Sequence, residues 1–429
     1  MAIRFIVLTL LLPLSALGGT TAIVGGTVAI GDGSAPIPGG TVVIRDGRIV
    51  TAGADVKVPQ GATIIDARGR WVSPGLIAPF TQLGIGSFSR VAEINDSTAA
   101  ESPFSAAIDV STAINPDDAP IQVSRAEGIT RAAVVPFAGK SIFGGQGAVI
   151  DLSKRMDVIM RPRAFQYVEL GAQADRPAGG SRPAAYAYFR EALEEARDYE
   201  QPFGAKGERR WHEVLTRADA AALVPVLEGK QPLLVHVNRA SDILHVLALR
   251  QSYPNLRLIL LGAREGWRVC AQIAAAHVPV VASVGDLPDN FDSLASTESN
   301  VGRMTRAGVT VAVSILGVYL EAYTRELASG LVAITREPGA SGLDWGQAFA
   351  TITSNPAKVL GLDGEIGSMR PGRRADVVIW DGDPLEVASA PVAVYIDGQP
   401  QSLDNHLTKL RDRYRQLPPG ALPKSYDHP

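Results

Sequence analysis

One stretch in the amino-terminal quarter of the chain is the starting point for predicting its fold. It reads Ser73-Pro74-Gly75-Leu76-Ile77-Ala78-Pro79-Phe80-Thr81-Gln82-Leu83-Gly84. Short β-like segments come before it, and a long alternation of apolar runs and helical patterns comes after it. We therefore interpret it as the point where the chain passes from a β-rich part into an α/β body.

The β-rich part draws on both ends of the chain. Residues 22–72 alternate short β-branched runs with turns, and Asp46-Gly47 is a hairpin signal between two of these runs. A matching set returns later, where residues 376–380 and 392–396 are strand-like and the second run leads into Asp397-Gly398. Two such flanks predict one small β-sandwich domain built from both chain ends.

The centre carries the alternation of a (β/α)8 barrel, which predicts a TIM-type α/β fold. Buried parallel strands are expected as short, continuous apolar runs. Such runs occur at residues 132–137, 148–152, 233–237, 256–261, 278–284 and 309–314. Helical patterns separate them at residues 190–199, 217–228, 242–250 and 267–277, and two more, at 319–333 and 344–360, complete the barrel.

The Ser73–Gly84 stretch closely resembles the first barrel strand of the amidohydrolase superfamily, whose pattern is Pro-Gly-Leu-Ile-Asp-x-His-x-His-Leu-Gly. Residues 144–151 resemble the imidazolonepropionase-like branch, residues 353–361 the last barrel helix, and residues 365–380 the return into the β-sandwich. The resemblance extends from about Ala22 to Gln399. With the patterns above, it predicts β-sandwich parts at 21–73 and 363–400, a barrel at 74–362 and a helical tail at 401–429.

In this superfamily a divalent metal at the carboxyl-terminal mouth of the barrel polarises the scissile carbonyl and converts a bound water to hydroxide. The resemblance implies where its ligands would lie, and these positions hold other residues: Phe80 and Gln82 for the first histidine pair, Asn238 and Gly262 for two further histidines, and Leu316 for the catalytic aspartate. We predict that these five residues line a pocket instead. No metal cofactor is expected, and zinc would bind only to a rebuilt site.

Two candidate donors remain. His236 matches a histidine in the fifth barrel strand of the superfamily. Asp151 ends a strand that in the imidazolonepropionase-like branch often ends with a lysine. Either could act as a general acid or base, a role that contributes about 10²- to 10⁴-fold to a rate. The alternatives are a strand-end cap for Asp151 and a core position for His236. The other histidines are predicted to be surface or packing residues: His212, His245, His277, His406 and His428.

Three functions follow from this comparison. The first is a catalytically degenerate barrel that binds a small ligand or a partner subunit, which the replacements Phe80, Gly262 and Leu316 favour because they make the mouth apolar. The second is a hydrolase of carbon–nitrogen bonds, in amides, dipeptides or cyclic amides, with a rebuilt metal site. The third is a metal-free enzyme that uses Asp151 or His236. We expect the first, although the superfamily's class is hydrolase.

Bulk composition is that of an ordinary globular protein, with 46% hydrophobic and 20% charged residues. The 41 basic and 44 acidic residues give a net charge of −3, which does not suggest nucleic-acid or membrane-surface binding. The single cysteine, Cys270, excludes an intrachain disulfide. Its apolar neighbours predict a buried structural thiol.

The amino terminus has the pattern of a secretory signal. Arg4 precedes an apolar run at residues 5–17, and small residues follow between Gly18 and Ala22. We therefore predict a signal peptide at residues 1–20 and an exported protein, periplasmic or secreted, with no membrane span in the mature chain. A homodimer, or pairing with an active homologue, is a further expectation because barrels of this superfamily often pair.

Overall fold

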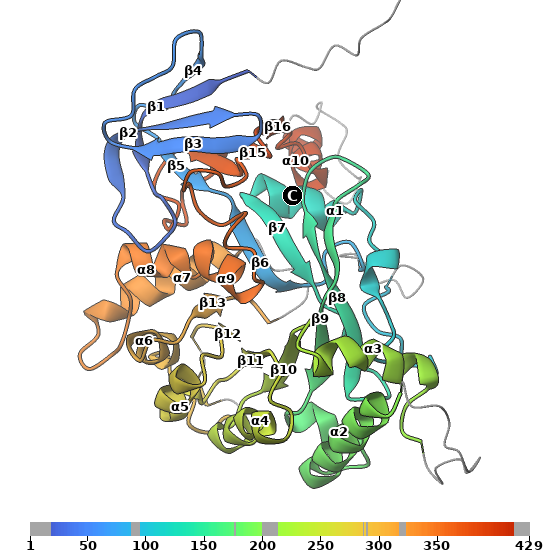
Figure 1. Ribbon diagram of the computed structural model, residues 1–429. Helices are drawn as coiled ribbons and strands as arrows, with labels where there is room; N and C mark the ends of the chain where they lie inside the picture. The colour runs from blue at the N-terminus through green and yellow to red at the C-terminus, as the bar shows by residue number, and fades with distance from the viewer. Residues whose placement is uncertain are drawn as a thin grey trace, which may run out of the picture.

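The computed structural model describes residues 19–86, 95–175, 177–199, 213–285, 287–288, 291–316 and 323–415. Figure 1 shows two parts, a β-rich domain that contains both blue and orange-red strands, and a barrel surrounded by helices. The predicted signal peptide lies outside the described residues apart from its last two positions. Within the described part of the chain, no helix is long and apolar enough to cross a membrane.

The β-rich domain is one sheet whose strands come from both ends of the chain, as the sequence predicted. Its strand order is β16-β15-β14-β5-β1-β2-β3, and β4 pairs with β1. The strands are β1 Thr21–Val28, β2 Ile37–Arg45, β3 Arg48–Gly53, β4 Thr63–Asp66, β5 Trp71–Pro74, β14 Val377–Trp380, β15 Pro391–Ile396 and β16 Gln399–Gln401.

Two hairpins of this domain follow directly from the sequence. Asp46 and Gly47, between β2 and β3, have φ angles of 50° and 71°, and Asp397 and Gly398, between β15 and β16, have φ angles of 52° and 73°. A two-residue turn with both φ angles positive matches the right-handed twist of paired strands, and Asp-Gly adopts it readily. The hairpin predicted at Asp46-Gly47 is thus confirmed.

The barrel sheet contains eight strands in the order β13-β12-β11-β10-β9-β8-β7-β6. They are β6 Leu76–Thr81, β7 Ile129–Val134, β8 Phe143–Asp151, β9 Ile159–Glu169, β10 Leu233–Val237, β11 Leu258–Gly262, β12 Val280–Ala282 and β13 Val311–Val313. The two edge strands of this sheet, β13 and β6, are bridged by Thr351 and Ile352. Val313 of β13 donates its N–H to the carbonyl of Thr351, and Ile77 of β6 donates its N–H to the carbonyl of Ile352. The barrel is therefore nearly closed, which confirms the predicted TIM-type fold.

One strand departs from the all-parallel expectation. β8 is antiparallel to both β7 and β9, whereas β6 with β7, and β9 through β13, pair in parallel. The carboxyl end of β8 consequently lies at the end of the barrel where the other strands begin.

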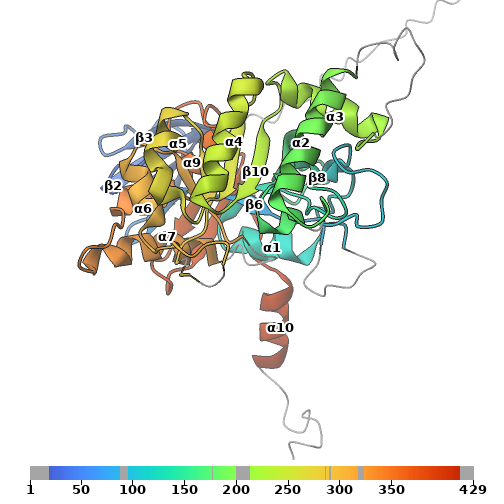
Figure 2. The ribbon, with the colours of Figure 1, turned by 90° about the horizontal axis from the view of Figure 1, so that it is seen from below.

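Helices surround the barrel sheet (Figure 1). The α-helices of the described residues are α1 Ala119–Ala126, α2 Arg182–Arg197, α3 Arg217–Leu227, α4 Ala240–Ser252, α5 Cys270–Ala275, α6 Asn300–Arg306, α7 Thr324–Ala333, α8 Trp345–Ala350, α9 Ser354–Val359 and α10 His406–Arg415. Ser181, Thr216 and Asp344 cap α2, α3 and α8 by accepting backbone N–H bonds. Figure 2 shows α10, the predicted helical tail, projecting from the body.

Two apolar layers hold the barrel together. The interior layer includes Phe80, Leu234, Leu261 and Ala312, and α9 contributes Val359 to it. The outer layer lies between the strands and the helices, and it buries the apolar faces of α2, α3 and α4. The free thiol of Cys270 packs partly buried against this outer layer.

Candidate functional site

The mouth of the barrel, defined here as the carboxyl-terminal ends of β6 and β9 through β13, contains a buried polar pair. His236 is the fourth residue of β10 and lies directly opposite Glu169, the last residue of β9. Side chains of directly opposed residues project from the same face of a sheet. The preceding same-face residue, Leu234, belongs to the barrel interior, so both polar side chains point inward.

The pair is joined by a short hydrogen bond. His236 Nδ1 lies 2.6 Å from Glu169 Oε2, and the His236 side chain is 18% exposed whereas that of Glu169 is 4% exposed. The Tyr167 hydroxyl donates to the same oxygen at 3.2 Å, and the Gly171 N–H donates to the other oxygen at 2.9 Å. Both oxygens of the Glu169 carboxylate are therefore already engaged by protein donors.

The carboxylate controls the protonation of its neighbours. Burial alone lowers the pKa of His236, but the adjacent Glu169 charge and hydrogen bond outweigh it and raise the pKa above the usual value. Burial, reinforced by Glu169, also raises the pKa of Tyr167 well above its usual value. Glu169 thus favours the protonated, ion-paired form of His236, and burial favours the neutral form of Tyr167.

Glu169 was missed by the sequence analysis, which predicted no strand over β9. The available signal was the alternation of Phe165 and Tyr167, two interior residues that precede Glu169 at the same spacing. Period-two alternation of this kind predicts a strand, and it would have placed the carboxylate at an inward-facing strand end.

The rim of the mouth is a network of charged groups that pair with one another. Asp292, in the segment after β12, forms ion pairs with Arg182 of α2 and with Arg239, which precedes α4. Arg182 also binds Asp242 at 3.0 Å. Burial raises the pKa of Asp292 despite the two arginines. These contacts attach the segment after β12 to the helices on the neighbouring side of the mouth.

The residues at the replaced ligand positions are brought to the same region, but they do not form a polar site. Phe80 is 3% exposed in the barrel interior, 6.3 Å from Phe137 between ring centroids, and Leu316 packs against the same interior layer. Gln82 is fully buried, and its amide nitrogen donates to Val135 at 3.4 Å. Its amide oxygen has no hydrogen-bond partner among the described residues.

Gly262 and Asn238 lie beside His236. Gly262 has a φ angle of +86°, and a side chain there would place its Cβ 2.5 Å from Asn238 Oδ1 and 3.0 Å from His236 Cδ2. The space that a histidine would require at position 262 is therefore filled by these two side chains.

Asp151 does not join His236, which corrects the expectation that both remain available at the mouth. Because β8 runs antiparallel, Asp151 lies opposite Arg131, near the start of β7, at the other end of the barrel. Its carboxylate binds Arg155 at 2.7 Å, lies 3.7 Å from Arg131, and accepts the Ser153 N–H at 2.8 Å. This arrangement matches the strand-end alternative.

The buried charge at that end is Arg131. Its fully buried guanidinium binds Asp376 through two 2.7 Å hydrogen bonds and Asp397 at 2.8 Å. Asp376 and Asp397 belong to the β-rich domain, so Asp151 takes part in the junction between the two domains.

The other histidines that the structure describes lie outside the mouth. His245 is on α4 with its ring 5.8 Å from that of Tyr186, His277 follows α5, and His406 begins α10. His212 and His428 lie outside the described residues.

The donors at the mouth do not fit a divalent metal. Among the described residues, no three His, Cys, Asp or Glu side chains lie close enough to hold a metal ion. A protein zinc site needs at least three such ligands, and a free lone pair on each. Glu169 and His236 provide two, and their facing atoms already bond to each other.

The fold and this mouth define a TIM-barrel protein with an appended β-domain, and the comparisons with known proteins specify the class further. The Amidohydrolase family profile matches residues 263–401. Amidohydrolase tasK of Hapsidospora irregularis is 24% identical over 378 residues, covering 80% of this chain and 38% of that protein. Imidazolonepropionase of Maricaulis maris (strain MCS10) is 39% identical over 103 residues, covering 24% of this chain and 25% of that protein.

Solved structures show the same fold. An amidohydrolase from Thermotoga maritima MSB8 superposes with a TM-score of 0.77 at 23% identity, covering 89% of this chain and 99% of that one. Molinate hydrolase superposes with a TM-score of 0.55 at 18% identity, covering 95% of this chain and 99% of that one.

The chain is thus similar to members of the amidohydrolase superfamily over most of its length. The superfamily is typically metal-dependent, so the donor set at this mouth departs from it. The aligned parts span well under two thirds of the length of the two relatives named above.

Proposed function

We propose that this protein is a degenerate amidohydrolase that binds a small ligand at the barrel mouth and does not perform metal-dependent hydrolysis. The observation that carries this proposal is the 2.6 Å hydrogen bond between His236 Nδ1 and Glu169 Oε2. It joins the two residues that could have served as ligands, and the neighbouring positions Phe80 and Leu316 are apolar. The described side chains at the mouth offer fewer than the three protein ligands that catalytic zinc requires.

The pair also indicates the chemistry of the ligand. With Nδ1 bonded to Glu169, the imidazolium of His236 keeps its Nε2–H as a donor. A carbonyl oxygen is a suitable acceptor, and Phe80 and Leu316 offer apolar surface for the rest of the molecule. Because the pair is neutral overall, we propose a small, largely apolar carbonyl compound rather than a strongly charged one.

The alternative is hydrolysis of carbon–nitrogen bonds without a metal. His236, oriented by Glu169, has the arrangement of an acid–base residue with an orienting partner. Its raised pKa suits a general acid that protonates a leaving amine. Relatives named as an amidohydrolase and as deaminases give this alternative its support. Such catalysis would be slow, since one acid–base residue contributes about 10²- to 10⁴-fold.

One experiment separates these functions. Metal content per chain is measured by plasma mass spectrometry on protein purified without chelator, and hydrolysis of amides, dipeptides and cyclic amides is assayed with and without chelator. Near-zero metal and no turnover above the His236→Gln variant supports the binding function. Turnover that survives chelator and is lost in His236→Gln supports the metal-free enzyme. About one metal per chain, with chelator-sensitive turnover, would overturn both.

We also propose that the protein is exported and forms a homodimer. The proposal of export rests on the signal-like pattern of residues 1–20, and β1 begins at Thr21, where that pattern ends. Amino-terminal sequencing of the exported protein tests it, because retention of Met1 would contradict cleavage. Light scattering after size-exclusion chromatography tests the dimer.

A further inference from the structure

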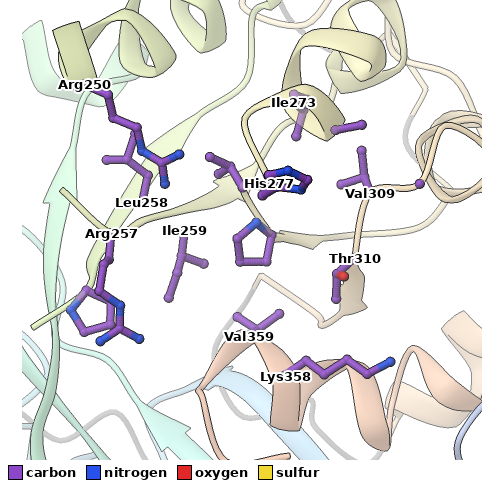
Figure 3. Close-up of a pocket in the computed structure, with 15 residues that line it drawn as sticks. Arg250, Arg257, Leu258, Ile259, Ile273, His277, Val309, Thr310, Lys358 and Val359 are labelled. Atoms are coloured by element: carbon purple, nitrogen blue, oxygen red, sulfur yellow. The ribbon is translucent and has the colours of Figure 1, made fainter. Parts of the chain in front are cut away.

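A separate pocket of about 410 Å³ opens at the amino-terminal end of the barrel, opposite the mouth. Figure 3 shows its lining residues. They come from the ends of α4, α5 and α9 and from the residues that precede or begin β10, β11, β12 and β13. Neither Glu169 nor His236 takes part in it, so any ligand here is distinct from a ligand at the mouth.

The pocket exists because β12 begins late. β11 and β12 pair only through Leu260 with Val280 and Leu261 with Val281, so the first residues of β11 have no strand partner on that side. Pro279 stands just before β12, and proline has no N–H with which to extend the ladder. The chain before Pro279 turns away, since Val278 donates to a carbonyl at the end of α5. A notch remains, with α9 beside it.

Four basic side chains surround this notch. Arg250 lies in the last turn of α4, Arg257 directly precedes β11, His277 follows α5, and Lys358 is on α9 (Figure 3). No lining residue is acidic. None of the four forms an ion pair with a residue that the structure describes. This local positive charge contrasts with the net charge of −3 of the whole chain.

One of the four basic groups, Arg250, is held in place by hydrogen bonds. Arg250 donates from Nε to the Leu256 carbonyl at 3.1 Å and from one terminal nitrogen to the Ala276 carbonyl at 2.6 Å. These bonds fix the guanidinium at the edge of the pocket, and they leave its second terminal nitrogen for another acceptor. Ile259 and Val359, which also line the pocket, are buried members of the barrel interior layer and give it an apolar wall.

We propose that this pocket binds a small organic phosphate, with the phosphate at the basic side chains and an apolar group against Ile259 and Val359. Three permanent cations match a dianion better than a single carboxylate, and guanidinium and ammonium groups both bind phosphate oxygens strongly. The volume is within the range of small-molecule sites.

Phenyl phosphate is the test ligand, measured by isothermal titration calorimetry at constant ionic strength. The pocket variant is Arg257→Gln/Lys358→Gln, which changes two exposed side chains. The matched control is Arg336→Gln/Lys409→Gln, which removes the same charge from exposed positions outside the pocket. We expect wild type and control to bind one phenyl phosphate per chain with equal affinity, and the pocket variant to bind at least about tenfold more weakly.

Three results would overturn the proposal: no saturable binding to wild type, equal weakening in the control variant, or benzoate binding as tightly as phenyl phosphate. Thermal unfolding of each variant checks that it is folded. If the double variant is not folded, the single variant Lys358→Gln replaces it, with a several-fold loss of affinity expected and an unchanged affinity counting against the site.

Discussion

His236 and Glu169 face each other across two adjacent parallel strands, with the imidazole Nδ1 2.6 Å from the carboxylate. One hydrogen bond therefore links the ends of two β/α units and keeps a charged pair beside the apolar interior layer of the barrel. Breaking such a pair by removing one partner leaves an uncompensated buried charge, which makes it sensitive to pH and to substitution.

The first prediction concerns the pH dependence of this pair. Because the pKa of His236 is raised on folding, its stabilising contribution is complete below about pH 6.5, the usual histidine value, and is lost as pH rises through the raised pKa. Glu169→Gln should lower the pKa of His236, measured by NMR titration of the imidazole, and should flatten the dependence of unfolding free energy on pH. Glu101→Gln, at an exposed ion pair, is the control and should change neither.

A titration midpoint of His236 below 6.5 in the wild type, or an unchanged midpoint in Glu169→Gln, would contradict the ion pair.

The second prediction concerns chelation. Because the donors that the structure describes at the mouth are too few to coordinate a metal, treatment with excess chelator should leave the melting temperature unchanged. Differential scanning calorimetry before and after chelation, followed by readdition of zinc, measures this. A large decrease that zinc reverses would show that a metal contributes to the stability of the fold.

The third prediction concerns Gly262. Alanine there adopts a left-handed backbone, which costs roughly 1–2 kcal/mol, and its Cβ crowds Asn238 and His236, which costs about 1–3 kcal/mol more. Gly372→Ala is the matched control, because Gly372 has a φ angle of +84° with no atom within 4 Å of the added Cβ. Urea denaturation should therefore show a larger loss for Gly262→Ala. Equal losses would mean that the mouth can make room for a side chain.

The fourth prediction concerns the junction between the domains. Arg131→Met leaves the buried carboxylate of Asp376 without its cation and removes the more distant of the two cations beside Asp151, and it should cost about 3–5 kcal/mol in the free energy of unfolding. Arg68→Gln breaks an exposed ion pair with Asp66 and should have no measurable effect. Chemical denaturation of both variants tests this, and similar values for the two would show that the junction does not depend on Arg131.

Much of the fold could be predicted because its signals are local. The apolar run at residues 233–237 is β10, and the Asp46-Gly47 hairpin forms as expected. The strand at Val377–Trp380 also lies where the returning β-rich pattern placed it. Each of these features depends on residues close together in the chain, where period and turn chemistry are informative.

The direction of β8 was not predicted, because an apolar run carries no information on direction. The lengths of the connecting segments, however, do indicate the direction of a strand. Residues 135–142 and 152–158 link β8 to its neighbours, and parallel strands need a crossover of about a dozen residues or more. β9 was missed because Arg161, Pro162 and Arg163 interrupt its pattern. Without β9, Glu169 could not be placed beside His236, so the main polar pair at the mouth was not foreseen.

The β-rich domain, finally, has a consequence for how the chain folds. β5 pairs with β14, and the Trp380 indole donates to Ser73 Oγ at 2.8 Å across 307 residues. The first strands therefore cannot complete their sheet until the last ones have been synthesised, so β5 keeps an open edge while the barrel forms. Closing so long a loop is entropically costly and slows folding. A chain truncated before Val377 would expose this edge permanently and should tend to associate through it.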